Sequence, residues 1–190
     1  MSLSLNEKLC HAQHSQLLIV DIQERLASAM PADILKNTIK NNRILLNAAN
    51  ELNIPVIYSE QYPKGLGHTV SKLSEALIAT NISFTKTCFA CTGEDGFSEI
   101  ISKNNRQQII IGGIESHICV LQTAIQLQRQ GYTVYVAEDA ICSRKKLNHK
   151  NAIKRLRQND VIVSNVESVL FEWLRDATHP KFKTLSQLIK

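Results

Sequence analysis

Short apolar runs alternate along the chain with longer segments whose apolar residues recur at helical spacing. Each apolar run is nearly saturated with Ile, Val or Leu, which indicates a buried strand. We predict strands at residues 16–22, 54–60, 82–87, 106–114, 132–140 and 160–166. The helical pattern predicts helices at residues 32–52, 70–80, 97–104, 116–130 and 148–159, and two short helical pieces between 167 and 190 that Pro180 separates. Pro55 stands where a strand tolerates proline, at its start, and Gly131 follows a helix as a stop signal.

Strands that are apolar on both faces and alternate with helices are typical of a parallel sheet covered on both sides. We therefore predict an α/β fold: a three-layer, Rossmann-like, doubly wound sheet of six strands. No repeat or linker divides the sequence, so residues 1–190 are expected to form one domain. Right-handed crossovers leave two common strand orders, and in both of them ligands bind at the carboxyl ends of the strands where the order reverses.

Composition bears on the expected cellular location of the protein and the redox state of its cysteines. No apolar run approaches the ~20 residues of a membrane span, and the N-terminal segment 1–16 lacks the basic and apolar blocks of a signal peptide. We expect a cytoplasmic protein with reduced thiols and no membrane partner. Its five cysteines are an odd number, unlike a disulfide framework.

The formal net charge is +5, and much of the excess lies between Arg144 and Arg157. This segment has no interleaved aromatic residues, and no helix-turn-helix or RNA-binding signature accompanies it. Ile153 and Leu156 indicate one buried stripe on a helix whose basic face is solvated. We therefore expect no nucleic-acid partner.

Three residues whose side chains could take part in catalysis fall at or after the carboxyl ends of predicted strands. Asp21 closes the first strand, Lys86 closes the third, and Cys119 follows the fourth near the start of a helix. With Ser116 as the N-cap, Cys119 would lie in the first turn, where unpaired N–H groups and the helix macrodipole favour a thiolate. Asp21 could then serve as its base, and Lys86 could favour the thiolate electrostatically.

Each of these residues also has a purely structural interpretation. A cysteine on a helix that covers a sheet is usually a small buried hydrophobe, and an aspartate after a strand can cap the next helix. Most lysines are simply solvated. Only the conjunction of Asp21, Lys86 and Cys119 points to catalysis.

The chain resembles a known superfamily in three segments. "LLIVDIQERL", "FTKTCFAC" and "IIIGGIESHICVLQTAIQLQRQGYTVYVAEDAICSR" are similar to the signature segments of the isochorismatase-like hydrolases, and the similarity is closest to the isochorismatase domain-containing proteins. The resemblance covers almost the whole chain. It implies a Rossmann-like sheet in 3-2-1-4-5-6 order and a homo-oligomer that acts on a small-molecule substrate.

The resemblance also implies functional residues. Asp21, Lys86 and Cys119 match the catalytic Asp–Lys–Cys triad of the superfamily, with Cys119 as nucleophile. A non-proline cis peptide before the nucleophile would join Ile114 to Glu115, and the backbone N–H groups of Glu115 and Cys119 would form the oxyanion hole. Gln23, Tyr62 and His117 are expected to border the substrate pocket from the neighbouring segments.

Two departures from the superfamily narrow the chemistry. Nicotinamidases carry an Asp-x-His pair and a further His that bind a metal, whereas this chain has Ser59-Glu60-Gln61 there, with His68 nearby. We therefore predict no metal and no other cofactor. Isochorismatases proper lack the nucleophilic cysteine, so Cys119 favours the C–N bonds of amides or ureido groups, cleaved through an acyl-cysteine.

Other interpretations stay open. The Cys88-x-x-Cys91 motif is typical of zinc or dithiol sites, but no second ligand pair completes a zinc set, which favours a packing role. Gly112-Gly113 is not a dinucleotide fingerprint, since G-x-G-x-x-G is absent. The chain could also be a non-catalytic partner-binding or redox-sensing module on the same fold, or a metal-dependent nicotinamidase.

Overall fold

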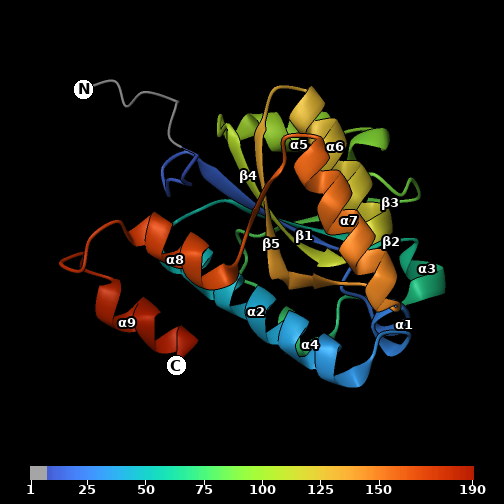
Figure 1. The fold of residues 1–190 in the computed structure, drawn as a ribbon, viewed down its shortest axis with the longest axis horizontal. Helices are drawn as coiled ribbons and strands as arrows, with labels where there is room; N and C mark the ends of the chain where they lie inside the picture. Colours follow the sequence, from blue (N-terminus) through green and yellow to red (C-terminus); the bar gives the residue numbers. More distant parts are fainter. Residues whose placement is uncertain (1–7) are drawn as a thin grey trace.

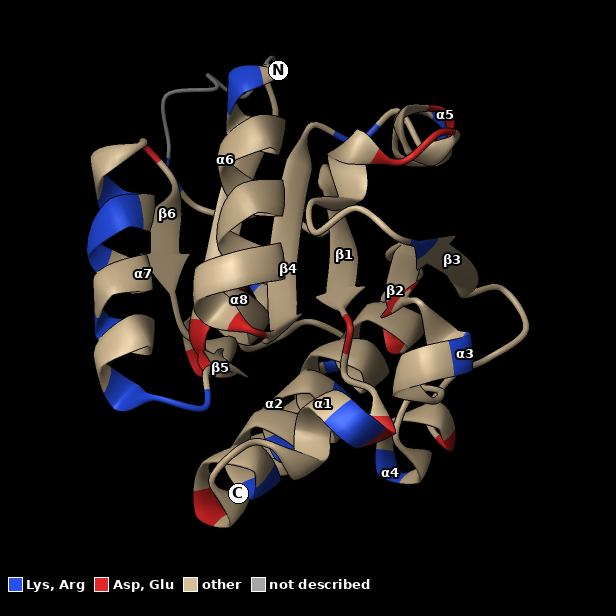
Figure 2. Cartoon of the chain, turned by 90° about the vertical axis from the view of Figure 1, so that its right-hand side faces the viewer, with Lys and Arg blue, Asp and Glu red and all other residues tan. Residues whose placement is uncertain are grey.

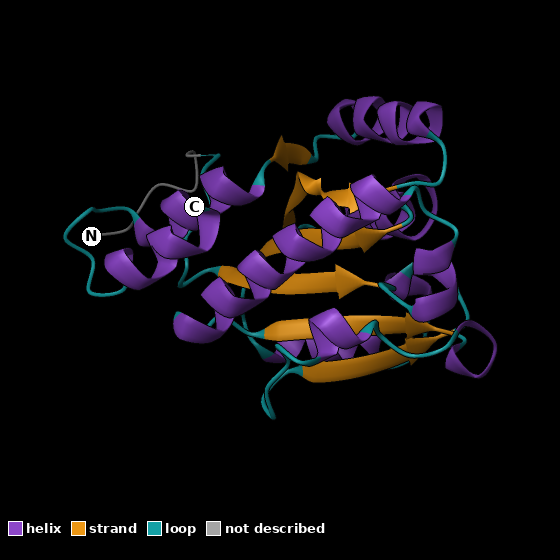
Figure 3. Cartoon of the chain, turned by 90° about the horizontal axis from the view of Figure 1, so that it is seen from below, coloured by secondary structure: helices purple, strands orange, loops and turns teal. Residues whose placement is uncertain are grey.

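A six-stranded parallel sheet organises the molecule (Figures 1 and 3). In the computed structural model, which describes residues 8–190, its order is β3-β2-β1-β4-β5-β6. The predicted fold class and strand order are confirmed. The segment judged for a signal peptide, residues 1–16, lies partly outside the described residues. The strands are β1 (Ser15–Val20), β2 (Val56–Gln61), β3 (Ile82–Lys86), β4 (Gln108–Ile114), β5 (Thr133–Cys142) and β6 (Ile162–Ser164).

Helices cover both faces of the sheet (Figure 1). α2 and α8 pack on one face, and α5, α6 and α7 pack on the other. The helices are α1 (Glu24–Ser28), α2 (Ala32–Glu51), α3 (Pro63–Leu66), α4 (Ser71–Ser74), α5 (Phe97–Lys103), α6 (Leu121–Arg129), α7 (Lys146–Gln158), α8 (Val166–Leu174) and α9 (Phe182–Ser186). Two 3₁₀ turns, Cys91–Gly93 and Gln187–Ile189, and one π-helical turn, Ser116–Val120, complete the elements. Within residues 8–190, no helix is both long enough and apolar enough to cross a membrane.

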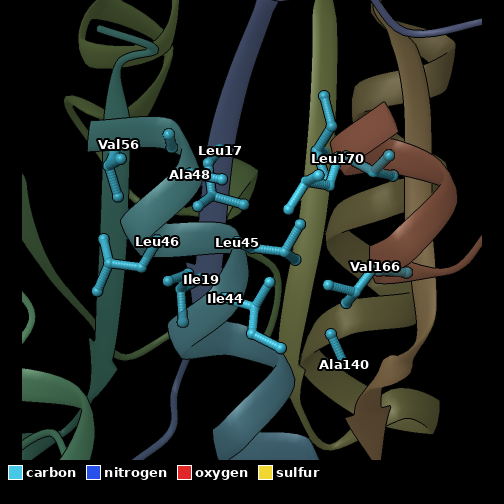
Figure 4. Packing of buried hydrophobic residues seen from close by; sticks show 14 of the residues in the cluster. Leu17, Ile19, Ile44, Leu45, Leu46, Ala48, Val56, Ala140, Val166 and Leu170 are labelled. Carbon is cyan, nitrogen blue, oxygen red and sulfur yellow. The ribbon is translucent and has the colours of Figure 1, made fainter. Parts of the chain in front are cut away.

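The core forms as two apolar layers, one on each side of the sheet. Figure 4 shows the α2 side, where Leu45 and Leu46 of α2 pack against the sheet in one cluster with Leu17 and Ile19 of β1. These four leucine and isoleucine side chains are at most 1% exposed. Each such side chain contributes roughly 1.5–3 kcal/mol by leaving water. The sheet is therefore clamped between two dry layers, and its polar chemistry is confined to the ends of the strands.

The segment between β2 and β3 is less helical than predicted. The helix expected at 70–80 is reduced to α4, which ends at Ser74. Beyond it, side chains take over the backbone hydrogen bonds: Asn50 Nδ2 donates to the Ala76 carbonyl at 3.2 Å, and Asn81 Oδ1 accepts from the Ile78 N–H at 2.9 Å. These bonds replace the helical ones and turn the chain into β3.

Two glycines let β4 pass closely between its neighbours. A Cβ on Gly112 would overlap the side-chain oxygen of Asn42, whose amide nitrogen donates to Thr38 and Ala140 carbonyls on α2 and β5. Gly113 has φ 128°, and a Cβ there would overlap the backbone of Val20. The strand that leads to Cys119 is therefore seated directly on β1 and α2 at this point.

Candidate active site

A buried ion pair joins the ends of β1 and β3. Lys86 Nζ lies 2.7 Å from Asp21 Oδ2, and both side chains are 0% exposed. β2 lies between these strands, and its last residue, Gln61, accepts from Lys86 Nζ through Oε1 at 2.6 Å. The carbonyls of Cys88 and Phe89 also accept from Nζ, at 3.2 and 3.1 Å. Four acceptors therefore surround one ammonium group.

The environment keeps Lys86 charged. Burial alone would lower the pKa of its ammonium group, because it removes water from the charged form. The negative charge of the Asp21 carboxylate is the main effect that opposes burial, and the pKa of Lys86 lies above its ordinary value. Lys86 thus supplies a fixed positive charge at the carboxyl ends of the strands.

Asp21 is held by β2 as well as by Lys86. Its backbone is left-handed, with φ 51°, and its N–H donates to the Ser59 carbonyl at 3.1 Å. Its second carboxylate oxygen, Oδ1, accepts from Ser59 Oγ at 2.7 Å. The carboxylate is therefore fixed through both oxygens, and the possible role of Asp21 as a simple helix cap receives no support, because α1 has no side-chain cap.

Cys119 lies in a π-helical turn, not in the first turn of an α-helix. The prediction that Ser116 is the N-cap of that helix is wrong. The Val120 N–H bonds to the Glu115 carbonyl at 3.3 Å, a five-residue spacing, and α6 begins only at Leu121. Ser116 Oγ lies 3.0 Å from His149 Nδ1 on α7 and makes no cap bond. Such turns are frequent at functional sites.

The thiol of Cys119 is protonated at neutral pH. Its pKa is raised to about 12, first by burial and then by the negative charge of Asp21 and a side-chain hydrogen bond to it, whereas Lys86 acts in the opposite direction. Burial and the charge of Asp21 therefore outweigh any easing of ionisation by the start of the helix. Cys119 is 6% exposed, so its thiol lies in a nearly dry environment. Its electrostatic interactions with Asp21 and Lys86 place it beside that ion pair.

The segment before Cys119 is tied to the loop after β5. The Ile114–Glu115 peptide is cis. The Glu115 carboxylate accepts from the Arg144 N–H at 3.0 Å and pairs with its guanidinium at 3.1 Å. His117 Nδ1 lies 2.9 Å from Ser143 Oγ. Together with the Ser116–His149 contact, these bonds fix the backbone from which Cys119 projects.

The other sequence-predicted residues occupy different environments. Gln23 is 0% exposed, and its amide bonds to the backbone of Gln61 and Gly67. Tyr62 is the residue just before α3 and is 55% exposed. His117 is half-buried and contacts Ser143 and Asn148 through its two ring nitrogens. Gln23 thus braces the strand ends, while Tyr62 lies at the surface beside them.

Residues at the nicotinamidase metal position do not fit a metal. Glu60 accepts from the N–H and hydroxyl of Thr69 at 2.7 and 2.8 Å, and its other oxygen lies 3.0 Å from His68 Nδ1. Ser59 and Gln61 are bound to Asp21 and Lys86. Within the described part of the chain, no three His, Cys, Asp or Glu side chains group as ligands. The donor atoms here already have protein partners.

The two cysteines of the CxxC motif face different surroundings. Cys88 is exposed, and its Sγ lies 3.1 Å from the Gly93 carbonyl. Cys91 is buried, with Sγ 3.7 Å from Ser59 Oγ. All five cysteines are free thiols. Cys88 therefore lies outside the site, and Cys91 lies at its inner edge.

Sequence reasoning missed two partners of the triad, Ser59 and Gln61. Both belong to the polar run at the end of β2, and polar residues in an otherwise apolar central strand are the signal that could have found them. A cavity of about 490 Å³ opens nearby between α2 and α7, with Cys142, Ser143 and His149 in its wall. It borders the loop that anchors the nucleophile segment, and the triad residues do not line it.

Comparisons with known proteins bear on the fold and the family of the chain. A family model described as the isochorismatase domain matches residues 15–168. Isochorismatase domain-containing protein 2 of Danio rerio is 38% identical over 175 residues, which cover 92% of this chain and 86% of that protein. The structure of MAR1 ribonuclease from Caenorhabditis elegans matches with a TM-score of 0.89 and 36% identity, over 95% of this chain and 92% of that one.

A further relative bears on location. The secreted isochorismatase effector Isc1 of Phytophthora sojae is 35% identical over 181 residues, which cover 93% of this chain and 85% of that protein. Relatives of this fold thus include a secreted protein, and the cytoplasmic location expected from the sequence stays a prediction.

Proposed function

The chain belongs to the isochorismatase family, and from this premise we propose that it is a metal-independent cysteine hydrolase. Its substrate would be a small molecule with a C–N bond of the amide or ureido type, cleaved through an acyl-cysteine intermediate. The observation that supports this most is the buried Asp21 carboxylate, fixed by Lys86 and acting on the Cys119 thiol through charge and a hydrogen bond.

The raised pKa of Cys119 makes a base essential to the proposal. With a pKa of about 12, the thiol is not ionised in advance and must lose its proton as it attacks. In the first step, Asp21 accepts that proton while Sγ bonds to the substrate carbonyl carbon, and the carbonyl oxygen becomes an oxyanion. The backbone N–H groups of Glu115 and Cys119 would stabilise this charge.

The remaining steps return every group to its starting state. The oxyanion re-forms the carbonyl, the C–N bond breaks, and Asp21 protonates the leaving nitrogen, which leaves a thioester on Cys119. Water then attacks the thioester with Asp21 as base, and the acid product and the free thiol are released. Throughout, the Lys86 ammonium group stays hydrogen-bonded to Asp21 and holds its carboxylate in place.

The proposal is tested by trapping the acyl-cysteine. A Cys88→Ser background removes the exposed thiol, and Cys119→Ala in that background is the matched control. Small primary amides and ureido acids are screened by intact-protein mass spectrometry and by ammonia release. We expect an acyl adduct on Cys119 with at least one compound and none in the control. A complete absence of adducts and ammonia across the screen would favour a non-catalytic binding module.

Two rival activities belong in the same screen. Nicotinamide tests whether the protein is a metal-dependent nicotinamidase. Release of ammonia from nicotinamide that requires added metal would support that activity. RNA cleavage is the second rival, because the C. elegans relative is named a ribonuclease. Lys and Arg residues recur along α7 (Figure 2) and their side chains are exposed, while Asp21, Lys86 and Cys119 are buried. RNA cleavage that survives Cys119→Ala would overturn the cysteine hydrolase mechanism.

A further inference from the structure

We propose that Ser59, supported by Cys91, is a positioning residue that fixes the carboxylate of Asp21 as the acceptor for the Cys119 proton. This inference rests on the proposed function, because it assigns Ser59 a task only if Asp21 is the base. Ser59 lies on β2, directly opposite Val20 in the parallel register. Ser59 therefore lies beside Asp21, the residue that follows Val20 at the end of β1.

Ser59 contacts Asp21 twice. Its carbonyl accepts from the Asp21 N–H at 3.1 Å, and its hydroxyl donates to Oδ1 at 2.7 Å. Ser59 is 1% exposed, so no water competes for that hydroxyl proton. Since Lys86 holds Oδ2 and Ser59 holds Oδ1, the plane of the carboxylate cannot rotate without breaking a buried bond.

Cys91 determines how the hydroxyl of Ser59 is used. Its Sγ lies 3.7 Å from Ser59 Oγ, and burial and the charge of Asp21 raise the pKa of the thiol to about 11. The thiol therefore keeps its proton and donates it to Ser59, whose single hydroxyl proton is left for Asp21. Cys91 is itself anchored, because its N–H donates to Thr123 Oγ1 at 3.0 Å on α6, one turn beyond Cys119.

A chain of donors thus runs from Cys91 through Ser59 to Asp21. Hydrogen bonds to a carboxylate favour its charged form, so removing the hydroxyl should make Asp21 easier to protonate. Other titratable groups coupled to this site are Lys86, Cys91 and Cys119, and the pKa of Cys91 depends in part on its hydrogen bond to Ser59. The effect of Ser59 on Asp21 must therefore be read from a signal of the Asp21 carboxyl itself.

The experiment compares Ser59→Ala with Ser59→Thr, which keeps the hydroxyl, in the Cys88→Ser background. Carbon-13 NMR of labelled aspartate follows the carboxyl of Asp21, assigned by its loss in Asp21→Asn. The release of nitrophenolate from 4-nitrophenyl acetate reports acylation of Cys119 as a function of pH, with Cys119→Ala as the blank. A matched pair of variants, Cys91→Ser and Cys91→Ala, tests the hydrogen bond that the Cys91 thiol donates to Ser59.

We expect Ser59→Ala to move both the titration of Asp21 and the acid limb of acylation to higher pH, and to slow acylation about tenfold or more. Ser59→Thr should restore both, and Cys91→Ser should perturb them less than Cys91→Ala. An unchanged Asp21 titration in Ser59→Ala overturns the proposal whatever the rate does. If the titration moves but wild type shows no acylation above the Cys119→Ala blank, the contact to Asp21 stands while both the proposed function and the positioning task of Ser59 fail.

Discussion

Lys86 Nζ lies 2.7 Å from Asp21 Oδ2 in a place where neither side chain touches solvent. This contact links two strands that are not neighbours in the sheet, and Cys119 joins it from the turn after β4. The pair therefore sets the electrostatics of the thiol, and the predictions below separate its effects on reactivity from its effects on stability.

Removal of the Asp21 charge should change two reactions of Cys119 in opposite directions. In Asp21→Asn, the pKa of the thiol falls, because the charge and hydrogen bond that raise it are gone while Lys86 stays. Alkylation of Cys119 by iodoacetamide at pH 8 should therefore become faster. Enzymatic acylation should become about 10²–10⁴-fold slower without its base. Peptide mass spectrometry measures the first rate and the substrate assay the second. Parallel losses in both would contradict the assignment of Asp21 as base, once circular dichroism shows an intact fold.

The pH dependence of alkylation reports the pKa of Cys119 directly. Since that pKa is about 12, the thiolate fraction of the wild type is small and should grow about tenfold per pH unit between pH 7 and 10. The labelling rate should show no plateau in this range. Time courses of iodoacetamide labelling, resolved by peptide, give the profile in the Cys88→Ser background. A plateau near neutral pH would mean that the thiolate is formed in advance.

Breaking the ion pair on one side should cost more stability than replacing both partners. Lys86→Met leaves the carboxylate of Asp21 buried without its cation, which should lower the free energy of unfolding by about 3–5 kcal/mol. The double variant Asp21→Asn with Lys86→Met removes both charges and should regain most of that loss. Urea denaturation measures four proteins, namely the wild type, Asp21→Asn, Lys86→Met and the double variant. Additive losses would show that the two side chains are not energetically coupled.

Stability should fall at mildly acidic pH because of His149. Burial lowers the pKa of its imidazole below the ordinary value, and the nearby Glu138, 4.0 Å away, opposes this without cancelling it. The unfolded chain then binds a proton at a higher pH than the native state, so the free energy of unfolding decreases as the pH falls through the ordinary range of histidine.

The His149→Gln variant checks this source of acid sensitivity. It should lose less stability than the wild type between pH 7 and 5.5 in urea titrations. His14→Gln, which changes an exposed histidine, is the control and should behave as the wild type does. Equal slopes for wild type and His149→Gln would exclude His149 as the cause.

The glycines of β4 should resist substitution for different reasons. Gly112→Ala meets the side chain of Asn42 and should destabilise the protein by about 1–3 kcal/mol. Gly113→Ala should cost more, because its Cβ meets the backbone of Val20 and its φ is 128°. Gly131→Ala has φ 93° but open space around it, so it isolates the cost of conformation alone. Thermal unfolding should rank Gly113→Ala as the most damaging of the three.

The strongly periodic elements could be predicted from the sequence, because local pattern determines them. The helix expected at 32–52 is found as α2, Ala32–Glu51, since its apolar stripe is buried against the sheet between Thr38 and Ala49. The same holds for β4, where every residue is buried. The apolar stripe of residues 70–80 predicts a longer helix than the structure has. The side chains of Asn50 and Asn81 bond to the backbone of Ala76 and Ile78, and the helix ends early.

The site was predicted less completely, because its properties depend on contacts between distant segments. Topology alone brings Asp21, Lys86 and Cys119 to one edge of the sheet. The π-helical turn contacts His149 on a distant helix, and the raised pKa of Cys119 depends on burial and on Asp21, neither of which local sequence encodes. Ser59 and Gln61 stand out as polar residues at the end of an apolar strand, but their partners follow only from the place of β2 between β1 and β3.

The four acceptors around Lys86 have a consequence for surveys that seek important lysines by their reactivity. Amine-directed reagents need an uncharged nitrogen that they can reach, and this one is shielded and holds all its protons. Such probes would mark the solvated lysines of α7 and pass over the one at the strand ends, so a ranking by nucleophilicity would place Lys86 at the bottom.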